Sequence, residues 1–488
     1  MVRLSSMTAE TKQDSSSAAG LGKQAARGAA WSGVGTIMLR LGSVVVGIVL
    51  ARILTPDEFG VYAIALTVQG ILMTMADLGL SAELIRSKDP ERIAPTVATL
   101  GVMSGTLLTI VTASSSHQLA ALLGNRDAGS AIAVLSFTML LAGVSLVPYG
   151  FMLRRFQQRE LFLISLVDLT VSTLTTFVLI AAGFGVVSLA IGRVTAQLVA
   201  STLQFVATKR VPRFGLDRTE WRRLLAFSMP IAGANLFAWI LLNVDNVIVA
   251  RIAGATALGY YVLGFNIANW PMSALSQVVR SIALPYVSRV RDGAAALPML
   301  TALVWALALP VGLTLAALAA PLIHVVYGSK WALSVPVLAA LGLYGSLRVA
   351  FDMFSGYLYA RGISRPVLYL QVLSLIALAT SMVAATQRWG IVGAAWANVG
   401  VSLVLTLPGY LIIVRSTGVK LRELAKACLL PTVAAIPAVA IAVLVGQLFA
   451  SPLASLLIGG AGAVIVYLAI AGRWLLARLQ IARAPVRA

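Results

Sequence analysis

The sequence has little cysteine, histidine or charge. Cys428 is the only cysteine in 488 residues, which excludes an intramolecular disulfide and a cysteine-based metal site. His117 and His324 are the only histidines, so imidazole chemistry is scarce as well. Charged residues make up 11% of the chain, whereas a soluble globular protein has about a quarter. With 59% hydrophobic residues and a mean hydropathy of +0.92, the chain is predicted to be an all-α, polytopic membrane protein without catalytic residues, metal or cofactor.

Acidic residues are scarcer than basic ones, with 17 Asp and Glu against 37 Lys and Arg. A nucleic-acid partner would need a basic surface, but the only basic run is the short cluster from Lys209 to Arg223. The other basic residues punctuate hydrophobic segments, as in the loops of a membrane protein. We therefore expect no nucleic-acid partner. The residues before Gly28 lack the apolar core of a secretory signal, so the first helix is expected to stay uncleaved.

Fourteen segments have the length and apolarity of a membrane-spanning helix. Hydrocarbon about 30 Å thick takes roughly 20 apolar residues per helix. The predicted spans are 29–51, 60–85, 93–115, 129–152, 160–182, 184–207, 224–250, 257–288, 297–319, 332–360, 363–386, 390–414, 424–447 and 453–477.

The basic residues alternate between the predicted connections. Most of them fall in every second connection and in the two tails, whereas the intervening connections hold Arg52, Arg126, Arg251, Lys330 and Arg388. Lys and Arg accumulate in cytoplasmic loops, so this alternation predicts a protein of the cytoplasmic membrane with both termini in the cytoplasm.

Two stretches of the chain repeat each other. The segment from Gly47 to Leu66 aligns without a gap with a segment 199 residues later, inside the stretch from Leu242 to Asn266. Each contains Ala-Arg-Ile followed by a glycine at the equivalent position, Gly60 and Gly259. A repeat this long is no solenoid unit and predicts two lobes of about six helices each.

The repeat also sets the predicted domain limits. We expect a cytoplasmic tail at 1–28, an N-lobe at 29–207, a cytoplasmic linker at 208–223, a C-lobe at 224–415, two further helices within 416–477 and a cytoplasmic tail at 478–488. The linker is expected to run along the membrane surface with Trp221 at headgroup level.

The repeated segments resemble a known family. Leu50 to Tyr62, LARILTPDEFGVY, is followed by Asp-Leu-Gly-Leu from Asp77, and the second half has Asn-Val-Asp-Asn from Asn243 and Leu-Gly-Tyr-Tyr from Leu258. This combination resembles the Wzx-like polysaccharide transporters of the multidrug/oligosaccharidyl-lipid/polysaccharide exporter superfamily. The resemblance implies two six-helix lobes around a central cavity. It also implies that a polyprenyl-pyrophosphate-linked oligosaccharide is flipped from the inner to the outer leaflet by alternating access, for cell-surface polysaccharide biosynthesis.

Such a transporter would have several partners. They are the lipid-linked oligosaccharide, membrane lipids, a proton or a sodium ion for coupling, and proteins of polysaccharide assembly.

The turn in the first repeat has the chemistry of a helix start. Thr55 can cap the next helix, Pro56 suits its first position, and Asp57 and Glu58 favour its positive end.

Charges inside the predicted spans are candidate sites, because an unpaired charge in hydrocarbon costs several kcal/mol. Arg40 lies about eleven residues from either end of the first span, too deep to reach the interface. It is expected to face the cavity and meet a substrate phosphate or Asp77, with Arg348 near it. Arg348 and Asp352 stand four residues apart on one helix, so they either neutralise each other or line the cavity.

Two further carboxylates fall within predicted spans. Asp168 either pairs with Arg193 on the next helix or serves ion coupling in the cavity. Asp245, between Asn243 and Asn246, either binds a coupling ion or holds helices together.

Polar residues follow one face of the eighth span. An aromatic ring flanked by amide and hydroxyl groups suits a sugar, although the same residues also serve helix packing. The candidate sugar-binding residues are Asn266, Trp270, Ser273, Gln277 and Arg280 on this span and Asn235, Trp239 and Asn246 on the seventh.

Three other functions fit part of the pattern. A lipid II flippase of the same superfamily fits the charges equally well. A cation-coupled multidrug exporter of the superfamily favours an acidic cavity, unlike the arginines here. A membrane glycan polymerase or glycosyltransferase is the enzyme alternative, but it needs catalytic groups on substantial outer loops, and the predicted outer loops are short.

Overall fold

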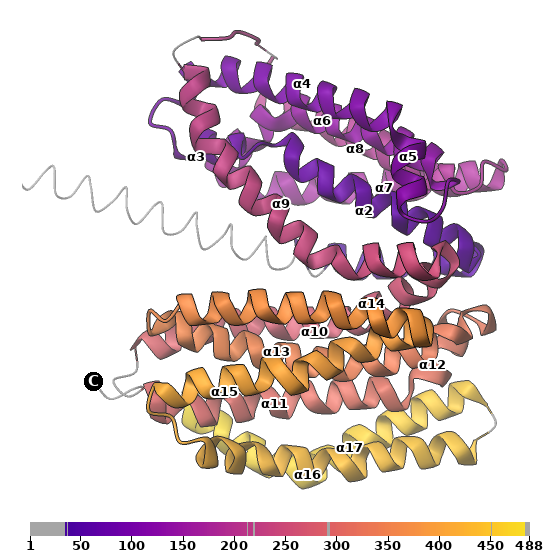
Figure 1. Ribbon diagram of the computed structural model, residues 1–488, viewed down its shortest axis with the longest axis vertical. Coiled ribbons are helices and arrows are strands. Elements are labelled where there is room, and N and C mark those ends of the chain that lie inside the picture. Colours follow the sequence, from indigo (N-terminus) through magenta and orange to yellow (C-terminus); the bar gives the residue numbers. More distant parts are fainter. Residues whose placement is uncertain are drawn as a thin grey trace, which may run out of the picture. The chain divides into compact units, whose positions relative to one another are not determined.

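The computed structural model describes residues 35–36, 38–211, 213–217, 220–289, 293–449 and 451–483 (Figure 1). The predicted tail at 1–28, the start of the first span and the end of the C-terminal tail lie outside these residues. Every regular element among the described residues is a helix, as predicted. By contacts the chain forms two compact units. Unit 1 is 1–53 and 61–243, and unit 2 is 54–60 and 244–488.

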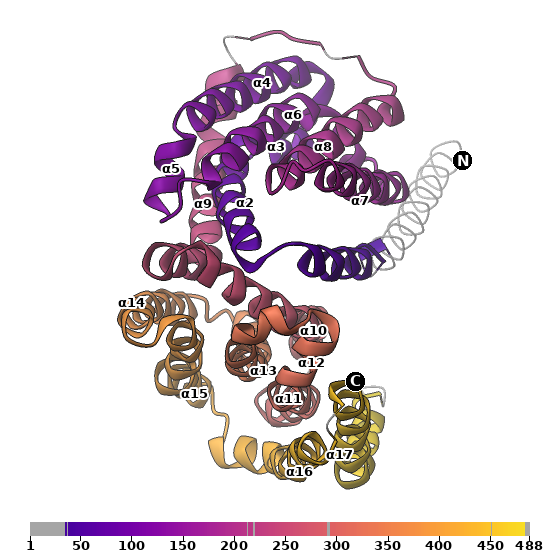
Figure 2. The ribbon, with the colours of Figure 1, turned by 90° about the vertical axis from the view of Figure 1, so that its right-hand side faces the viewer.

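Unit 1 is a bundle in which α6 packs between α4 and α8 and α7 pairs with α8 (Figure 2). Its elements are helical residues 38–53, α2 (Pro56–Ala76, from residue 61), α3 (Leu80–Arg86), α4 (Pro90–Ser114), α5 (Ser116–Leu122), α6 (Ala128–Arg154), α7 (Gln158–Ala181), α8 (Val187–Thr208) and α9 (Glu220–Ala253, to residue 243).

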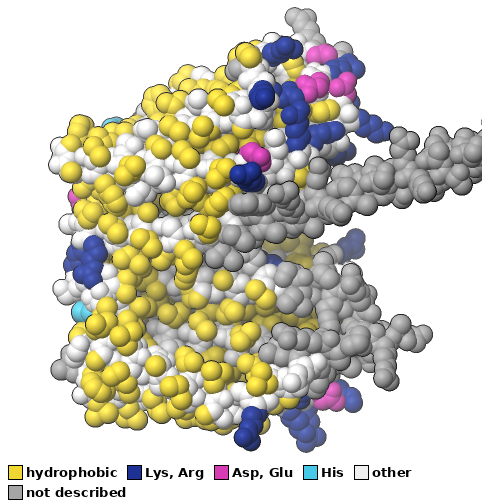
Figure 3. Space-filling view, turned by 180° about the vertical axis from the view of Figure 1, so that it is seen from behind, with side chains coloured by type: hydrophobic (Ala, Val, Ile, Leu, Met, Phe, Trp, Pro, Cys, Tyr) yellow, Lys and Arg dark blue, Asp and Glu magenta, His cyan; other side chains and the backbone are white. Residues whose placement is uncertain are grey.

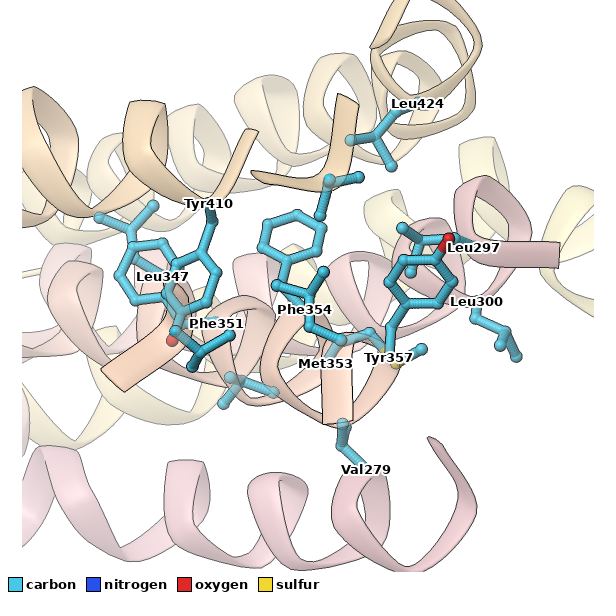
Figure 4. Close-up of a cluster of buried hydrophobic side chains, with 14 of the residues drawn as sticks. Val279, Leu297, Leu300, Leu347, Phe351, Met353, Phe354, Tyr357, Tyr410 and Leu424 are labelled. Carbon is cyan, nitrogen blue, oxygen red and sulfur yellow. The ribbon is translucent and has the colours of Figure 1, made fainter. Parts of the chain in front are cut away.

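Unit 2 is centred on α13, which packs against α10 and α11. Its further elements are α10 (Ala255–Arg289), α11 (Gly293–Ala317), α12 (Ala319–Val326), η1 (Ser329–Ser334), α13 (Val335–Ala360), α14 (Arg365–Val401), η2 (Ser402–Thr406), α15 (Leu407–Ser416), α16 (Leu421–Leu448) and α17 (Pro452–Arg483). Figure 4 shows the core where Phe351 stacks on Tyr410 with ring centroids 5.4 Å apart.

The same helix crossing occurs in both units. In unit 1, α4 meets α6 at Gly101 and Gly143, where a Cβ on Gly143 would lie 2.2 Å from the Gly101 carbonyl oxygen. In unit 2, α11 meets α13 at Gly312 and Gly342, where a Cβ on Gly312 would lie 2.4 Å from the Gly342 carbonyl oxygen. Small residues allow such close backbone approach between membrane helices. The common crossing supports the internal repeat that the sequence predicts.

The predicted span 60–85 is confirmed as far as Ala76, but its continuation to residue 85 is wrong because the chain breaks at Asp77, Leu78 and Gly79. The helix runs from Pro56 to Ala76, and α3 starts at Leu80. Leu78 and Gly79 have φ of 48° and 70°, which no helix tolerates, and the Asp77 carboxylate accepts hydrogen bonds from the Ser81 amide and hydroxyl. The Asp77 side chain therefore satisfies an amide in the first turn of α3, whose N-cap residue is Gly79.

The predicted break between spans 363–386 and 390–414 is confirmed within α14. Gly390 has φ 59° and ψ −145°, and beyond it the chain runs back along itself. Thr406 Oγ1 donates to Ser374 Oγ at 3.0 Å, and a Cβ on Gly409 would touch Leu370. Ten helices of the described residues are long and apolar enough to cross a membrane, or up to eleven if bent pairs count as one span. The total of fourteen stays a prediction.

The predicted helix start after Thr55 is confirmed. The Glu58 amide donates to Thr55 Oγ1 at 3.3 Å, and the Thr55 amide donates to a Glu58 carboxylate oxygen at 2.8 Å. This reciprocal pair is a capping box, and Pro56 takes the first helical position.

The segment 54–60 packs in unit 2 against the equivalent turn of the second repeat. A Cβ on Gly60 would lie 1.8 Å from the Ala255 oxygen, and one on Gly259 would lie 2.1 Å from the Pro56 oxygen. Thr256 Oγ1 donates to Asp57 Oδ1 at 2.6 Å, and these two residues are 199 positions apart, as are Gly60 and Gly259. Equivalent positions of the two repeats therefore meet at this contact.

The linker between the predicted lobes lies along the start of α4 in unit 1. The Arg210 guanidinium binds both carboxylate oxygens of Glu91, one of them at 2.8 Å. Arg92 lies 3.5 Å from Glu220, and the amides of Gly215 and Asp217 donate to threonine hydroxyls of α4. Figure 3 shows basic and acidic side chains gathered at one end of unit 1 and hydrophobic ones along its sides.

Candidate functional site

The charged residues of α13 are held by α10. Arg348 Nη1 donates to Asn269 Oδ1 at 3.0 Å, and Arg280 Nη1 lies 3.6 Å from Asp352 Oδ1. No ion pair joins Arg348 to Asp352 within the described part of the chain. Of the two predicted alternatives for Arg348 and Asp352, the intrahelical pair is therefore not formed, because α10 packs along α13 and brings its own polar side chains within reach, and the cavity role stays a prediction.

The Arg280–Asp352 pair reaches the surface of unit 2. The Arg280 side chain is 59% exposed and that of Asp352 20%. The second carboxylate oxygen of Asp352 is buried, and no hydrogen-bond donor reaches it among the described residues. Arg348 borders a cavity of about 10 Å³ beside Asn269 and Tyr344, a space close to that of one water molecule. Arg348 is thus held by an amide oxygen and Arg280 by a single carboxylate.

The polar stripe of α10 faces away from the core of unit 2. Asn266, Trp270, Gln277 and Arg280 are exposed, and the half-buried Ser273 donates to the Trp270 carbonyl at 3.0 Å. The opposite face of the helix is buried. A ligand could therefore reach the stripe, and its role in sugar binding stays a prediction.

The second predicted row, on α9, does not fall in one unit. Asn235 and Trp239 belong to unit 1 and Asn246 to unit 2. The Trp239 ring lies against α2, where a Cβ on Gly70 would be 2.0 Å from it. Trp239 therefore has a packing role, whereas a sugar-binding role for this row stays a prediction.

In unit 1 the predicted pair between α7 and α8 is present. Arg193 Nη1 lies 2.7 Å from Asp168 Oδ2, with side chains 35% and 21% exposed. Arg40 is half-buried in the helical residues 38–53. Arg40 and Asp77 belong to unit 1 and Arg348 to unit 2, so the common cleft that we expect for them stays a prediction.

Asp245 is the centre of a buried hydrogen-bond network in unit 2. Its carboxylate accepts hydrogen bonds from the backbone amide of Asn246 at 2.9 Å and from the Tyr261 hydroxyl at 3.2 Å. The Asn398 amide of α14 donates to Tyr261 Oη at 3.4 Å and to the Ala394 carbonyl at 3.2 Å. The network joins three helices, as helix-to-helix contacts would, and it also clusters the oxygen atoms that a cation needs.

Tyr261 and Asn398 were missed by sequence reasoning. Asn398 lies 137 residues from Tyr261, and its only signal is an amide in the middle of an apolar span. Asn269 was missed because it falls one position outside the polar stripe of α10.

Comparisons with known proteins decide the family. The profile of a family described as "Polysaccharide biosynthesis protein" matches residues 49–336. The chain belongs to this family. It is 25% identical over 400 residues to the teichuronic acid biosynthesis protein TuaB of Bacillus subtilis (strain 168), covering 79% of this chain and 82% of that one.

Two other relatives are named for surface polysaccharides. The succinoglycan biosynthesis transport protein ExoT of Rhizobium meliloti (strain 1021) is 26% identical over 64% of this chain and 65% of its own. The lipopolysaccharide biosynthesis protein WzxC of Escherichia coli (strain K12) is 24% identical over 88% of both chains. These relatives and the family confirm the resemblance to the Wzx-like transporters.

Solved structures share the fold. The inward closed conformation of the lipid II flippase MurJ matches with a TM-score of 0.76 at 13% identity, over 91% of this chain and 98% of that one. An inward-facing multidrug resistance transporter of the MATE family matches with a TM-score of 0.58 at 16% identity, over 78% and 96%. The chain is therefore a multi-pass membrane protein with the fold of this transporter superfamily.

Proposed function

We propose that this protein flips a polyprenyl-pyrophosphate-linked oligosaccharide from the inner to the outer leaflet of the cytoplasmic membrane. The observation that carries the proposal is the family match over residues 49–336, in a chain with the fold of the superfamily's flippases. It acts in polysaccharide biosynthesis as a carrier and not as an enzyme, alongside polysaccharide assembly proteins. Both termini lie in the cytoplasm.

The head group would be carried by arginines. Two negative charges cannot cross bare hydrocarbon, but guanidinium groups in a hydrated cleft keep a pyrophosphate solvated. Arg40 and Arg348 supply the cations, Arg193 adds its charge once its ion pair with Asp168 opens, and the lipid tail stays in the bilayer. The glycan follows the exposed stripe of α10, where Trp270 and Gln277 offer an aromatic face and amide groups.

Asp245 is the proposed ion-coupling residue. Its carboxylate and the Tyr261 hydroxyl, to which the Asn398 side-chain amide donates, lie within one buried network, which a proton or a sodium ion would alter on binding. Asp168 is the second candidate, although its ion pair with Arg193 neutralises it in this structure.

Lipid II flipping is the nearest alternative, because the fold matches a lipid II flippase over 91% of the chain. Both lipids present the same pyrophosphate to the same arginines. The family and the names of the relatives favour a surface-polysaccharide precursor.

The test is transport by the purified full-length protein in liposomes. A labelled polyprenyl-pyrophosphate oligosaccharide, labelled lipid II and a cationic drug are compared for their movement across the bilayer. We expect movement of the oligosaccharide lipid only. Movement of lipid II alone would make lipid II the substrate in place of the oligosaccharide lipid. Movement of the drug alone would contradict the proposed function.

A further inference from the structure

A basic cavity lies at the linker end of unit 1, outside the proposed transport site. It has a volume of about 450 Å³ and is formed by α4, the end of α6, the end of α8 and the linker. Four basic residues line it, Arg155, Lys209, Arg210 and Arg213, against one acidic residue, Glu91. An excess of positive charge in an open cavity attracts an anion.

One of these four basic residues, Arg210, already binds a carboxylate. Arg210 binds Glu91 with two hydrogen bonds and lies over the Phe151 ring, 3.5 Å from its centroid. Arg210 therefore fixes the linker to α4 and α6. Arg155, Lys209 and Arg213 are exposed and form no ion pair with any described residue. Glu91, the one carboxylate of the lining, is bound by Arg210 and also interacts with the charges of Arg155 and Arg213, so the cavity keeps an excess of positive charge.

Part of the cavity lining is apolar. It consists of the buried Ala94 and Ala98 of α4 and the half-buried Val144 and Val147 of α6 and Phe205 of α8. The alanines leave space beside α6 that larger side chains would fill. A phosphate alone needs far less room than this, and it would leave the apolar part uncovered.

The position of the cavity identifies its occupant. The spans α4, α6 and α8 all start or end at this cavity, at Pro90, Arg154 and Thr208. Ends of membrane-spanning helices lie at the level of lipid head groups, where basic pockets between helices bind anionic lipids.

We infer that this cavity binds an anionic phospholipid, with its phosphate between Arg155, Lys209 and Arg213 and the first carbons of an acyl chain against Ala94 and Ala98. The proposed topology places the cavity in the cytoplasmic leaflet, so the leaflet rests on the proposed function, while the binding itself does not. The lipid would hold the linker on unit 1.

The experiment measures lipid binding to the purified full-length protein in uncharged detergent. Short-chain phosphatidylglycerol, short-chain phosphatidylcholine, a short-chain polyprenyl pyrophosphate and inorganic phosphate are titrated by calorimetry. Arg155→Gln with Arg213→Gln removes two charges from the cavity. Lys88→Gln with Arg222→Gln removes two exposed charges from the same end of unit 1, outside the cavity lining, and is the matched control.

We expect the wild-type and control proteins to bind phosphatidylglycerol but not phosphatidylcholine. We expect the cavity variant to bind phosphatidylglycerol at least roughly 10-fold more weakly than the wild type. Equal binding by the two variants would overturn the site. Competition by inorganic phosphate at the same concentration as the lipid would make it a site for free phosphate, and stronger binding of a polyprenyl pyrophosphate would assign it to the substrate. Either result overturns the phospholipid.

A second variant tests the apolar part. Ala98→Phe keeps every charge and fills the space that the acyl chain would take. We expect it to weaken phosphatidylglycerol binding while inorganic phosphate is unaffected, and unchanged lipid binding would contradict the proposal. Because no transport is measured, failure of the proposed function would leave these results intact, and the reverse is also true.

Discussion

Arg40 is the residue on which the proposed transport of an anionic head group depends most. Its planar guanidinium can bind two phosphate oxygens at once, whereas lysine supplies only a point charge. We expect Arg40→Ala to abolish nearly all delivery of labelled lipid-linked oligosaccharide to the outer leaflet, and Arg40→Lys to retain part of it. The rates are compared at matched protein amounts. Arg222→Ala is the control, and an Arg40→Ala variant that transports at the wild-type rate would exclude Arg40 from the mechanism.

The network around Asp245 separates its two possible roles. Asp245→Asn keeps the size of the side chain but removes the charge that a coupling ion would need. We expect this variant to fold and to lose the dependence of transport on an imposed proton or sodium gradient. Tyr261→Phe removes a hydroxyl that contacts both Asp245 and Asn398, so it should destabilise the protein by about 1–3 kcal/mol. Unchanged gradient dependence in Asp245→Asn would leave Asp245 with a packing role only.

The partner of a side chain was predictable from the sequence only where the two residues lie on helices that are consecutive in the chain. Asp168 and Arg193 lie on consecutive spans, and their pairing was foreseen as one of two alternatives. The partners of Arg348 and Asp352 come from α10, whose rotation about its axis no sequence pattern fixes. The linker cavity escaped notice for the same reason, since three helix ends and a loop have to meet to form it.

At the scale of the element, the apolar composition predicts where the helices lie. The positions at which they break depend on the backbone torsion angles of single residues and on local hydrogen bonds. The break at Gly390 was predicted from a polar interruption between two apolar segments. The break at Asp77 was not predicted, because the apolar segment continues past it to Ile85 with only isolated polar residues. There the hydrogen bonds from Ser81 to Asp77 compensate for the lost helical ones.

The crossing of α4 and α6 yields a prediction about stability. In Gly143→Ala the new Cβ would lie 2.2 Å from the Gly101 oxygen, so the helices have to move apart. We expect a loss of about 1–3 kcal/mol, seen as a lower melting temperature in detergent. Gly446→Ala in α16 is the control, since apart from the backbone of its own helix turn nothing lies within 4 Å of the added Cβ, and it should be neutral or slightly stabilising. Equal melting temperatures for the two variants would show that α4 and α6 can move apart without loss of stability.

At the scale of the whole molecule, the contact between the two repeated turns offers a test of movement. Asp57 and Thr256 are hydrogen-bonded, so cysteines at both positions in a Cys428→Ala background should form a disulfide on oxidation. If alternating access separates these turns, the oxidised protein should stop transporting and the reduced protein should recover. Each single-cysteine variant is the control. Full transport by the oxidised double variant would show that the contact stays closed throughout the cycle.

The same contact has a consequence for the origin of the chain. When two identical halves meet across a twofold axis, a residue on the axis faces its own copy, so a half-length ancestor would have paired Asp with Asp or Thr with Thr at this point. Two aspartates would repel, and two threonines would lack the charge. The hydrogen bond from Thr256 to Asp57 requires two different residues at equivalent positions. Equivalent positions can hold different residues only after the gene for one half has been duplicated, so this contact is expected to have arisen after the duplication.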